Sequence, residues 1–508
     1  MRRLLLLIWL ALVGIQLVLG VTWIAQNLDA VPDYGDTGDY LQLARTLEVD
    51  AYRGIAYPAF IAGVNSLPGG AGLLRSAGRG ASGTKMKAGV VYLQVIQFLT
   101  SLAGFAYFLR VFVTRVGPEA SPWIARGAGV LLLLLLLFDP LVAHFDLAVM
   151  TDGLTLSASL AFCAALADFG LGGSRRWLSG LVLFASLVLA ATLRVEKLWV
   201  CACTALAALV VWLFLQRRAA PEERQFSLAR AAQIAGIVLL GGLTVSWLHR
   251  SAHADSRRWP MYDSMLHARI VFPNVSKVYD ELPAKVQSRI SRKDAQRHDT
   301  DSIVGFRVIN DATGASGPIR VKDRREMGKD GTRPSAERER RSMLETIAGV
   351  VLRERWAALA ADVFKDALEN VAATFSFYVR LAILARTGDV SCADGTQKTY
   401  EVLSQRHPRT SLYYVCSSVA LVLSSAALAL AALVRRGQSG APRVEHRTLI
   451  TWIPVAAFVL ANACAFALRA DMVHIRYMLL AHVAFLVLVF RGALDWLAAG
   501  RVSPPAGR

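Results

Sequence analysis

The first 45 residues decide how the rest of the chain is interpreted. Met1-Arg2-Arg3 precede an apolar run from Leu4 to Ala25 (LLLLIWLALVGIQLVLGVTWIA), and an acidic stretch follows from Asp33 to Arg45 (DYGDTGDYLQLAR). The apolar run exceeds the roughly 7–15 residues of a signal-peptide core and reaches the ~20 residues that span a bilayer. It therefore predicts an uncleaved first transmembrane helix, with its N-terminus inside and the acidic stretch at the opposite membrane face.

The composition of the whole chain indicates a membrane protein. Of its 508 residues 55% are hydrophobic, and the mean hydropathy is +0.42. Soluble proteins of this length are less apolar. The net charge of +18 fits Lys and Arg in cytoplasmic loops and attraction to anionic lipids better than it fits nucleic acid. We therefore expect an all-α, polytopic fold in the cell (inner) membrane and no nucleic-acid partner.

Ten stretches are apolar and long enough to cross the bilayer. They are residues 4–25, 89–109, 127–145, 153–171, 177–193, 198–215, 230–248, 411–434, 449–468 and 476–497.

The basic residues fix the expected orientation of these spans. With ten helices starting inside, each short inside segment carries arginines, such as Arg175 and Arg176 between the fourth and fifth spans. This distribution follows the positive-inside rule and predicts that both termini are cytoplasmic. The chain then divides into a transmembrane module 1–248 that contains a first outer loop 26–88, an extracytoplasmic insertion 249–410, and C-terminal transmembrane helices 411–508.

The two long outer segments differ in character. Pro68 to Lys87 is rich in Gly and Ser and predicts a flexible loop. Residues 285–345 are dense in charged residues, so part of the insertion is expected to be disordered. From Arg340 to Leu384 apolar residues recur every three to four positions. This spacing predicts amphipathic helices that lie on the membrane or pack on the other outer loop.

The acidic stretch has both a structural and a chemical interpretation. Tyr40, Leu43, Ala44 and Leu47 share one helical face, which predicts an interfacial helix with its apolar side on the bilayer. Asp36 precedes Tyr40 by one turn. It is interpreted either as a helix cap that favours the helix dipole or as a general base or metal ligand, with Asp39 as the reserve.

The residues of this loop resemble a known family. Asp36-x-x-x-Tyr40-x-x-x-Ala44, followed by Tyr57-Pro58-x-Phe60, is similar to the first extracytoplasmic loop of GT-C glycosyltransferases. The resemblance is closest to the dolichyl-phosphate-mannose protein mannosyltransferase and aminoarabinose transferase group. It implies transfer of a sugar from a polyprenyl-phosphate carrier at the outer membrane face. It also implies a catalytic role for Asp36, with Asp39, Tyr40 and Tyr57 near the substrate.

Two further matches extend the resemblance. Thr151-Asp152-Gly153-Leu154 is similar to an acidic motif at the start of the family's fourth helix, which implies a catalytic role for Asp152; a Thr151 or Asp152 helix cap is the alternative. Before the last span, the motif Arg469-x-Asp471-x-x-His474-x-Arg476-Tyr477 is similar to an Arg-Tyr motif of related chains, although the helix that follows lacks the family's proline.

Cationic side chains on the outer turns supply a candidate phosphate site. Arg194 and Lys197 join the fifth and sixth spans, and His474 and Arg476 precede the last span. Guanidinium groups bind phosphate oxygens in a bidentate manner, so a lipid phosphate is a natural ligand. The alternative is that these side chains extend to anionic lipid headgroups.

These expectations combine into a glycosyltransferase hypothesis with open alternatives. A divalent cation (Mg²⁺ or Mn²⁺) on Asp36 and Asp152 is compatible with it, because carboxylates suit hard cations. The acceptor, which is a protein, a lipid or a glycan, is not readable from the sequence. A transporter or flippase of a lipid-linked substrate and a non-catalytic envelope assembly protein are the alternatives.

Overall fold

The structure is a computed structural model that is helical in every regular element it describes. It describes residues 2–28, 36–47, 54–68, 70, 73–74, 84–114, 122–172, 176–218, 226–252, 270–298, 333–387, 407–438, 446–469 and 478–498. Its long helices are α1 (Arg2–Asn27), α4 (Thr84–Thr114), α5 (Pro122–Leu137), α7 (Asp152–Gly170), α8 (Arg176–Leu193), α9 (Glu196–Arg218), α10 (Leu228–Ala252), α16 (Arg333–Thr387), α18 (Pro408–Gln438), α19 (His446–Arg469) and α20 (Leu479–Ala498).

The predicted all-α, polytopic architecture is confirmed. Within the described ranges nine helices are long and apolar enough to cross a membrane. The bent pair of α5 and α6 (Pro140–Leu147) adds a tenth crossing when it is counted as one span. All ten predicted spans coincide with these segments. Which face of the bundle is cytoplasmic stays a prediction from the basic loops.

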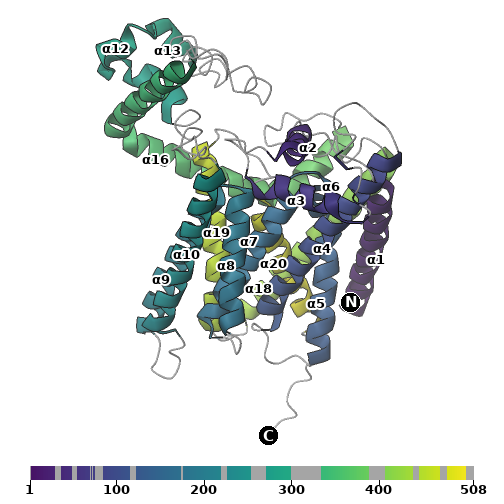
Figure 1. Cartoon of the computed structure of the whole chain (residues 1–508). Helices are drawn as coiled ribbons and strands as arrows, with labels where there is room; N and C mark the ends of the chain where they lie inside the picture. The colour runs from purple at the N-terminus through teal and green to yellow at the C-terminus, as the bar shows by residue number, and fades with distance from the viewer. Residues whose placement is uncertain are drawn as a thin grey trace.

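The shorter helices gather at one end of the bundle. Figure 1 shows α2 (Asp36–Thr46), α3 (Ala56–Ser66) and α16 at this end. The end of α8 lies at the same end of the bundle. There Gly54, two residues before α3, packs against the backbone of Thr192 and Leu193. We call this end the α2–α3 face.

The third predicted span is broken rather than straight. α5 and α6 meet at Phe138-Asp139-Pro140 with a bend of 63°. Proline lacks an amide hydrogen and suits the first turn of a new helix. The Asp139 carboxylate caps α6 by accepting hydrogen bonds from the backbone amides of Leu141 and Val142, at 3.0 and 3.2 Å. The sequence therefore starts a second helix where hydropathy alone predicts one continuous span.

Side chains from distant helices satisfy the polar groups at this break. The Phe138 carbonyl accepts hydrogen bonds from Gln16 of α1 at 2.9 Å and from the Tyr414 hydroxyl of α18 at 2.6 Å. Asp139 also accepts a hydrogen bond from the Tyr378 hydroxyl of α16 and lies 3.1 Å from His482 Nε2 of α20. The break thus ties four helices to one point.

The other end of α6 is held in a similar way. Gln94 of α4 donates to the Leu147 carbonyl at 2.9 Å. Gln97, one turn later, donates to the carbonyls of Asp146 and Ala148 at 2.9 and 3.0 Å. Gln97 in turn accepts a hydrogen bond from the buried Tyr57 hydroxyl of α3 at 2.7 Å. This network fixes the turn that leads into α7.

The apolar face of α2 lies against protein and not on the bilayer, so the predicted interfacial placement is wrong. Tyr40, Leu43 and Ala44 are buried. Tyr40 packs edge-on against Tyr57 of α3, with ring centroids 5.0 Å apart. Of the predicted face only Leu47, which follows the helix, is exposed. The expected helix start at Tyr57-Pro58 is confirmed, since both residues lie in the first turn of α3.

The insertion contains a small helical core on the α2–α3 face. The short helices η3 (Phe272–Asn274), η4 (Ser276–Glu281), α12 (Ala284–Gln287) and α13 (Arg292–His298) share a buried cluster with the first half of α16 and with α19. Residues 284–287 and 292–298 therefore form short helices, whereas the expectation that part of 285–345 is disordered stays a prediction. Residues 299–332 lie outside the described residues.

The predicted helix at 340–384 is confirmed as part of α16. This 55-residue helix changes direction at Arg355, whose φ of −133° is not helical. The expectation of a flexible loop at Pro68 to Lys87 falls largely outside the described residues, and α4 already begins at Thr84.

The break gives a first prediction. Replacing Asp139 by Ala leaves the Tyr378 hydroxyl and two buried backbone amides without their acceptor, so it should destabilise the fold by about 3 kcal/mol. Thermal unfolding of the purified protein in detergent, followed by tryptophan fluorescence, measures the fall in melting temperature. Asp280→Ala is the matched control, because the Asp280–Arg292 pair is 69% and 62% exposed and contributes little. Equal melting temperatures for the two variants would contradict the role given to Asp139.

Candidate functional site

A buried ion pair at the α2–α3 face forms the centre of the candidate site. Asp152 is the first residue of α7, and Arg194 follows the last residue of α8. Arg194 donates to the Asp152 carboxylate at 2.6 Å and to the Thr151 hydroxyl at 3.0 Å. The Asp152 and Arg194 side chains are only 2% and 10% exposed. The Thr151 side chain does not cap α7. Its hydroxyl accepts the hydrogen bond from Arg194 instead.

A second cation lies one turn further along the same segment. Lys197 is in the first turn of α9 and is buried. Its ammonium donates to the side-chain oxygen of Asn462 on α19 and lies 5.6 Å from the ring centroid of Phe458. The short turn between α8 and α9 thus places two cationic side chains beside each other. α7 supplies the partner of Arg194, and α19 supplies the partner of Lys197.

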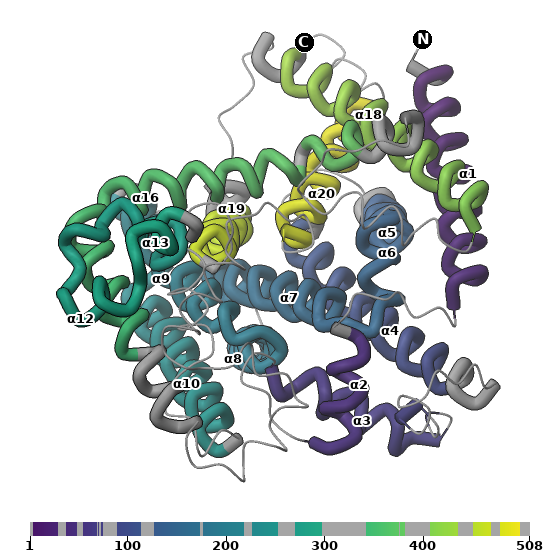
Figure 2. The backbone as a smooth tube through the Cα atoms, turned by 90° about the horizontal axis from the view of Figure 1, so that it is seen from above, coloured from purple at the N-terminus to yellow at the C-terminus, as the bar shows by residue number. Residues whose placement is uncertain are grey.

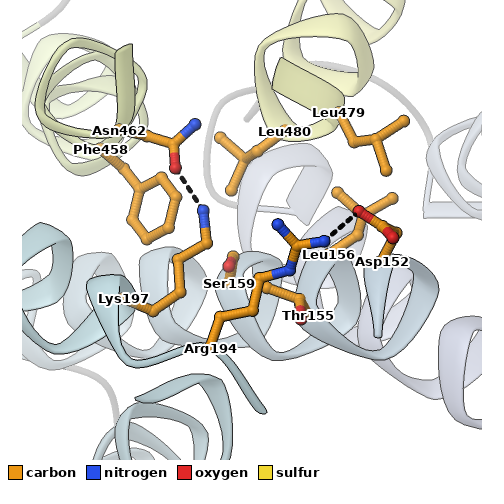
Figure 3. Close-up of a pocket in the computed structure, with 10 residues that line it drawn as sticks. All are labelled: Asp152, Thr155, Leu156, Ser159, Arg194, Lys197, Phe458, Asn462, Leu479 and Leu480. Carbon is orange, nitrogen blue, oxygen red and sulfur yellow. Dashed lines mark hydrogen bonds and ion pairs between the residues drawn. The ribbon is translucent and has the colours of Figure 1, made fainter. Parts of the chain in front are cut away.

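These residues line a pocket with one polar and one apolar side (Figure 3). Figure 3 shows Arg194 and Lys197 entering the same space, with the leucines of α20 opposite. The lining residues are Asp152, Thr155, Leu156, Ser159, Arg194, Lys197, Phe458, Asn462, Leu479 and Leu480. Because Ser159 lies two helical turns below Asp152, the pocket reaches roughly 10 Å into the bundle.

The acidic loop predicted from the sequence borders this site. The Thr37 hydroxyl, one residue after Asp36, donates to the Val149 carbonyl at 3.5 Å. Val149 lies three residues before Asp152, so the start of α2 lies beside the turn that precedes the ion pair. The carboxylate of Asp152 also contributes to the raised pKa of Tyr57, after burial and Tyr40. Tyr57 is therefore a neutral hydrogen-bond donor over the physiological pH range.

The structure brings together part of the predicted site. Asp152, Arg194 and Lys197 share the pocket, and Tyr40 and Tyr57 pack in the neighbouring core of α2 and α3. Asp36 begins α2, although its side chain lies outside the described residues, and Asp39 follows on the same helix. His474 and Arg476 also lie outside the described residues.

Several lining residues were missed by sequence reasoning. Asn462 and Phe458 lie in the predicted span 449–468, and Thr155 and Ser159 lie in the span 153–171. The signal that was available is Asn462, an amide within an apolar run, because such groups are costly in a bilayer unless they are paired or functional. Its pairing with Lys197 required the fold, since the two residues are 265 positions apart.

The site combines the Asp152 carboxylate, a second carboxylate from Glu196 that lies 3.7 Å from Arg194, two cations and several hydroxyl and amide groups. Such a set can bind an anionic group and stabilise developing negative charge. Among the described residues, no group of three or more His, Cys, Asp or Glu side chains gathers as a metal site would require. Asp152 is paired with Arg194. The predicted Mg²⁺ or Mn²⁺ site on Asp36 and Asp152 stays a prediction, because the Asp36 side chain lies outside the described residues.

Comparison with known proteins yields one distant structural likeness. No protein-family model matches the chain, and no curated protein matches it. Among solved structures, the chain is similar to the crystal structure of ArnT from Cupriavidus metallidurans bound to undecaprenyl phosphate, with 12% identity and a TM-score of 0.36. The match covers 98% of this chain and 81% of that chain. This likeness is too weak to indicate a function for the chain.

The close packing of Gly54 gives a second prediction. A Cβ atom at residue 54 would lie 2.1 Å from the Thr192 carbonyl oxygen, which requires a backbone shift beside Arg194. Gly54→Ala should therefore destabilise the protein by about 1–3 kcal/mol. Gly63→Ala on α3 is the matched control, since a Cβ there meets nothing within 4 Å, and it should be neutral or stabilising by up to about 1 kcal/mol. Thermal unfolding of both variants tests this, and the opposite ranking would contradict the packing.

Proposed function

We propose that this chain is a membrane glycosyltransferase that moves a sugar from a polyprenyl-phosphate donor to an acceptor at the α2–α3 face. The observation that carries the proposal is the pocket in which the half-buried Arg194 and the buried Lys197 lie beside the Asp152 carboxylate. The resemblance of the Asp36–Phe60 segment and of Thr151-Asp152 to GT-C enzymes supports the same assignment. In this proposal the α2–α3 face is extracytoplasmic and both termini are cytoplasmic.

The pocket suits an amphiphilic anion. Arg194, Lys197 and Asn462 offer N–H donors for phosphate oxygens. Leu156, Phe458, Leu479 and Leu480 offer an apolar wall for the first part of a lipid chain. Ionisable side chains beside a bilayer are costly unless they are paired or functional. A phosphate that reaches the pocket from the membrane can compete with Asp152 for Arg194.

The proposed reaction needs one carboxylate and the two cations. The acceptor oxygen or nitrogen forms a bond to the anomeric carbon, while the bond from that carbon to the phosphate oxygen breaks and its electron pair stays on the phosphate. The proton of the acceptor passes to a carboxylate, for which Asp36 is the first candidate and Asp152 the second. Arg194 and Lys197 stabilise the negative charge that grows on the leaving phosphate.

The ion pair implies an exchange of partners during binding. Without an anionic ligand, the Asp152 carboxylate occupies the Arg194 guanidinium at 2.6 Å. A lipid phosphate competes with this carboxylate for the same N–H groups. When Arg194 turns to the phosphate, Asp152 loses a charge partner and becomes a better proton acceptor, because a nearby cation favours the ionised carboxylate. Donor binding would thus prepare the base.

The role of Asp36 is tested by Asp36→Asn. The variant should lose at least ~100-fold in turnover, because it lacks the proton acceptor, while its melting temperature and its polyprenyl-phosphate binding stay unchanged. Product is measured by mass spectrometry of envelope glycans and glycolipids made with the wild type and with each variant. Asp280→Asn in the insertion, whose carboxylate is 69% exposed, is the control and should stay active. Full activity of Asp36→Asn would contradict its role, and movement of lipid-linked sugar without new glycosidic bonds would favour a transporter.

The exchange of partners is tested by Asp152→Asn. The amide no longer competes as an anion for Arg194, so the affinity for polyprenyl phosphate should rise about tenfold, which corresponds to ~1.4 kcal/mol. Lys197→Met should weaken the same binding, whereas Lys365→Met, whose lysine is 74% exposed on α16, should not. Binding is measured by native mass spectrometry with undecaprenyl phosphate. Weaker lipid binding by Asp152→Asn would contradict the competition.

A further inference from the structure

The second half of α16 has three faces of different chemistry. One face is buried and carries Leu359, Val363 and Ala367, which share a cluster with Ala463 and Ala467 of α19. The same face continues to Phe377 in the main core of the bundle. This face holds the helix on the transmembrane bundle.

A second face is apolar and uncovered. Phe364, Leu368 and Val379 are 53%, 51% and 47% exposed, and we call them the apolar row. At 100° per residue the row lies roughly 140° around the helix from the buried face. Trp356, just after the change of direction at Arg355, is also 66% exposed. Large exposed apolar side chains that share one side of a helix indicate a surface that binds a membrane or a partner.

The third face is charged. It carries Asp362, Lys365 and Glu369, and Lys365 and Glu369 form an exposed ion pair at 3.9 Å. This face lies roughly 100° from the apolar row and roughly 120° from the buried face. The helix is thus arranged to contact protein, an apolar medium and water at the same time.

The position of the helix identifies the apolar medium. Figure 1 shows α16 crossing the bundle at the level where the membrane helices end, and Figure 2, viewed from above, shows it running along one side of the bundle past α19 and α20. The spans also expose large apolar side chains outward, such as Leu460 of α19 at 48% and Trp247 of α10 at 65%. The bilayer covers such side chains in a polytopic protein, and α16 lies at the end of the helices that carry them.

We propose that the second half of α16 is an interfacial helix whose apolar row inserts into the outer edge of the bilayer and anchors the insertion 249–410 there. Amphipathic helices with Phe and Leu on one face and charges on another bind membranes in this orientation. A second copy of the chain fits less well, because three half-exposed side chains supply far less than the ~800 Å² that each partner of a standard dimer buries. The proposal does not depend on the proposed enzymatic function.

Site-directed spin labelling tests the proposal. Single cysteines are placed at Phe364 and Leu368, and at the control positions Lys365 and Glu369, in a variant in which the natural cysteines are replaced. The protein is reconstituted into nanodiscs of phosphatidylethanolamine and phosphatidylglycerol. Labels at 364 and 368 should be more accessible to oxygen, which enters the bilayer, than to a water-soluble nickel complex. Labels at 365 and 369 should show the reverse.

Two outcomes would overturn the proposal. The first is equal access of the nickel complex to all four labels, which would place the apolar row in water. The second is a dipolar distance between two labels at residue 364, which would show a second copy on the row. Where the cysteine-free background does not fold, a benzophenone amino acid at 364 in the otherwise natural chain replaces the label. It should then crosslink to lipid, and crosslinking to protein would contradict the proposal.

Discussion

Backbone carbonyls and amides at membrane depth must find partners within the protein, because no water is there to bind them. The break between α5 and α6 is where this constraint is strongest. Gln16 and Tyr414 satisfy the Phe138 carbonyl, and Asp139 caps the new helix. The buried Asp139 carboxylate needs partners of its own, which Tyr378 and His482 provide. Helices α1, α16, α18 and α20 are therefore held around one helix break.

The same constraint positions the candidate site. α6 is short, so its C-terminal carbonyls are also uncovered, and Gln94 and Gln97 bind them. These bonds fix the turn that delivers Asp152 to Arg194, and Tyr57 links the turn to α3. The hydrogen bonds around the helix break at Pro140 and around the end of α6 thus position the residues of the proposed phosphate pocket. It also explains why α2 packs on protein, since Tyr40 covers the Tyr57 ring that belongs to this network.

Hydropathy and charge predicted the spans well, because bilayer thickness acts on each apolar run independently of its neighbours. The same reasoning missed the 63° bend at Asp139. A buried carboxylate there needs hydrogen-bond partners, and these come from other helices that hydropathy does not place beside it. In the site, the motif resemblance pointed to Asp152 and the outer turn between two spans pointed to Arg194 and Lys197, and the structure brings these three together. Asn462 and Phe458 could not be predicted, because only helix packing brings α19 to Lys197. The short helices within 284–298 could not be predicted from this charged segment, because its few apolar residues find a core only on α16 and α19.

The central claim is that the pocket between α7, the α8–α9 turn, α19 and α20 binds the phosphate of a polyprenyl lipid. The most direct measurement is a cryo-EM structure of the full chain in nanodiscs with undecaprenyl phosphate. The account predicts phosphate density within hydrogen-bond distance of Arg194 and Lys197, with the Asp152 carboxylate released from Arg194. Lipid phosphate bound elsewhere, with the Arg194–Asp152 pair intact, would contradict it.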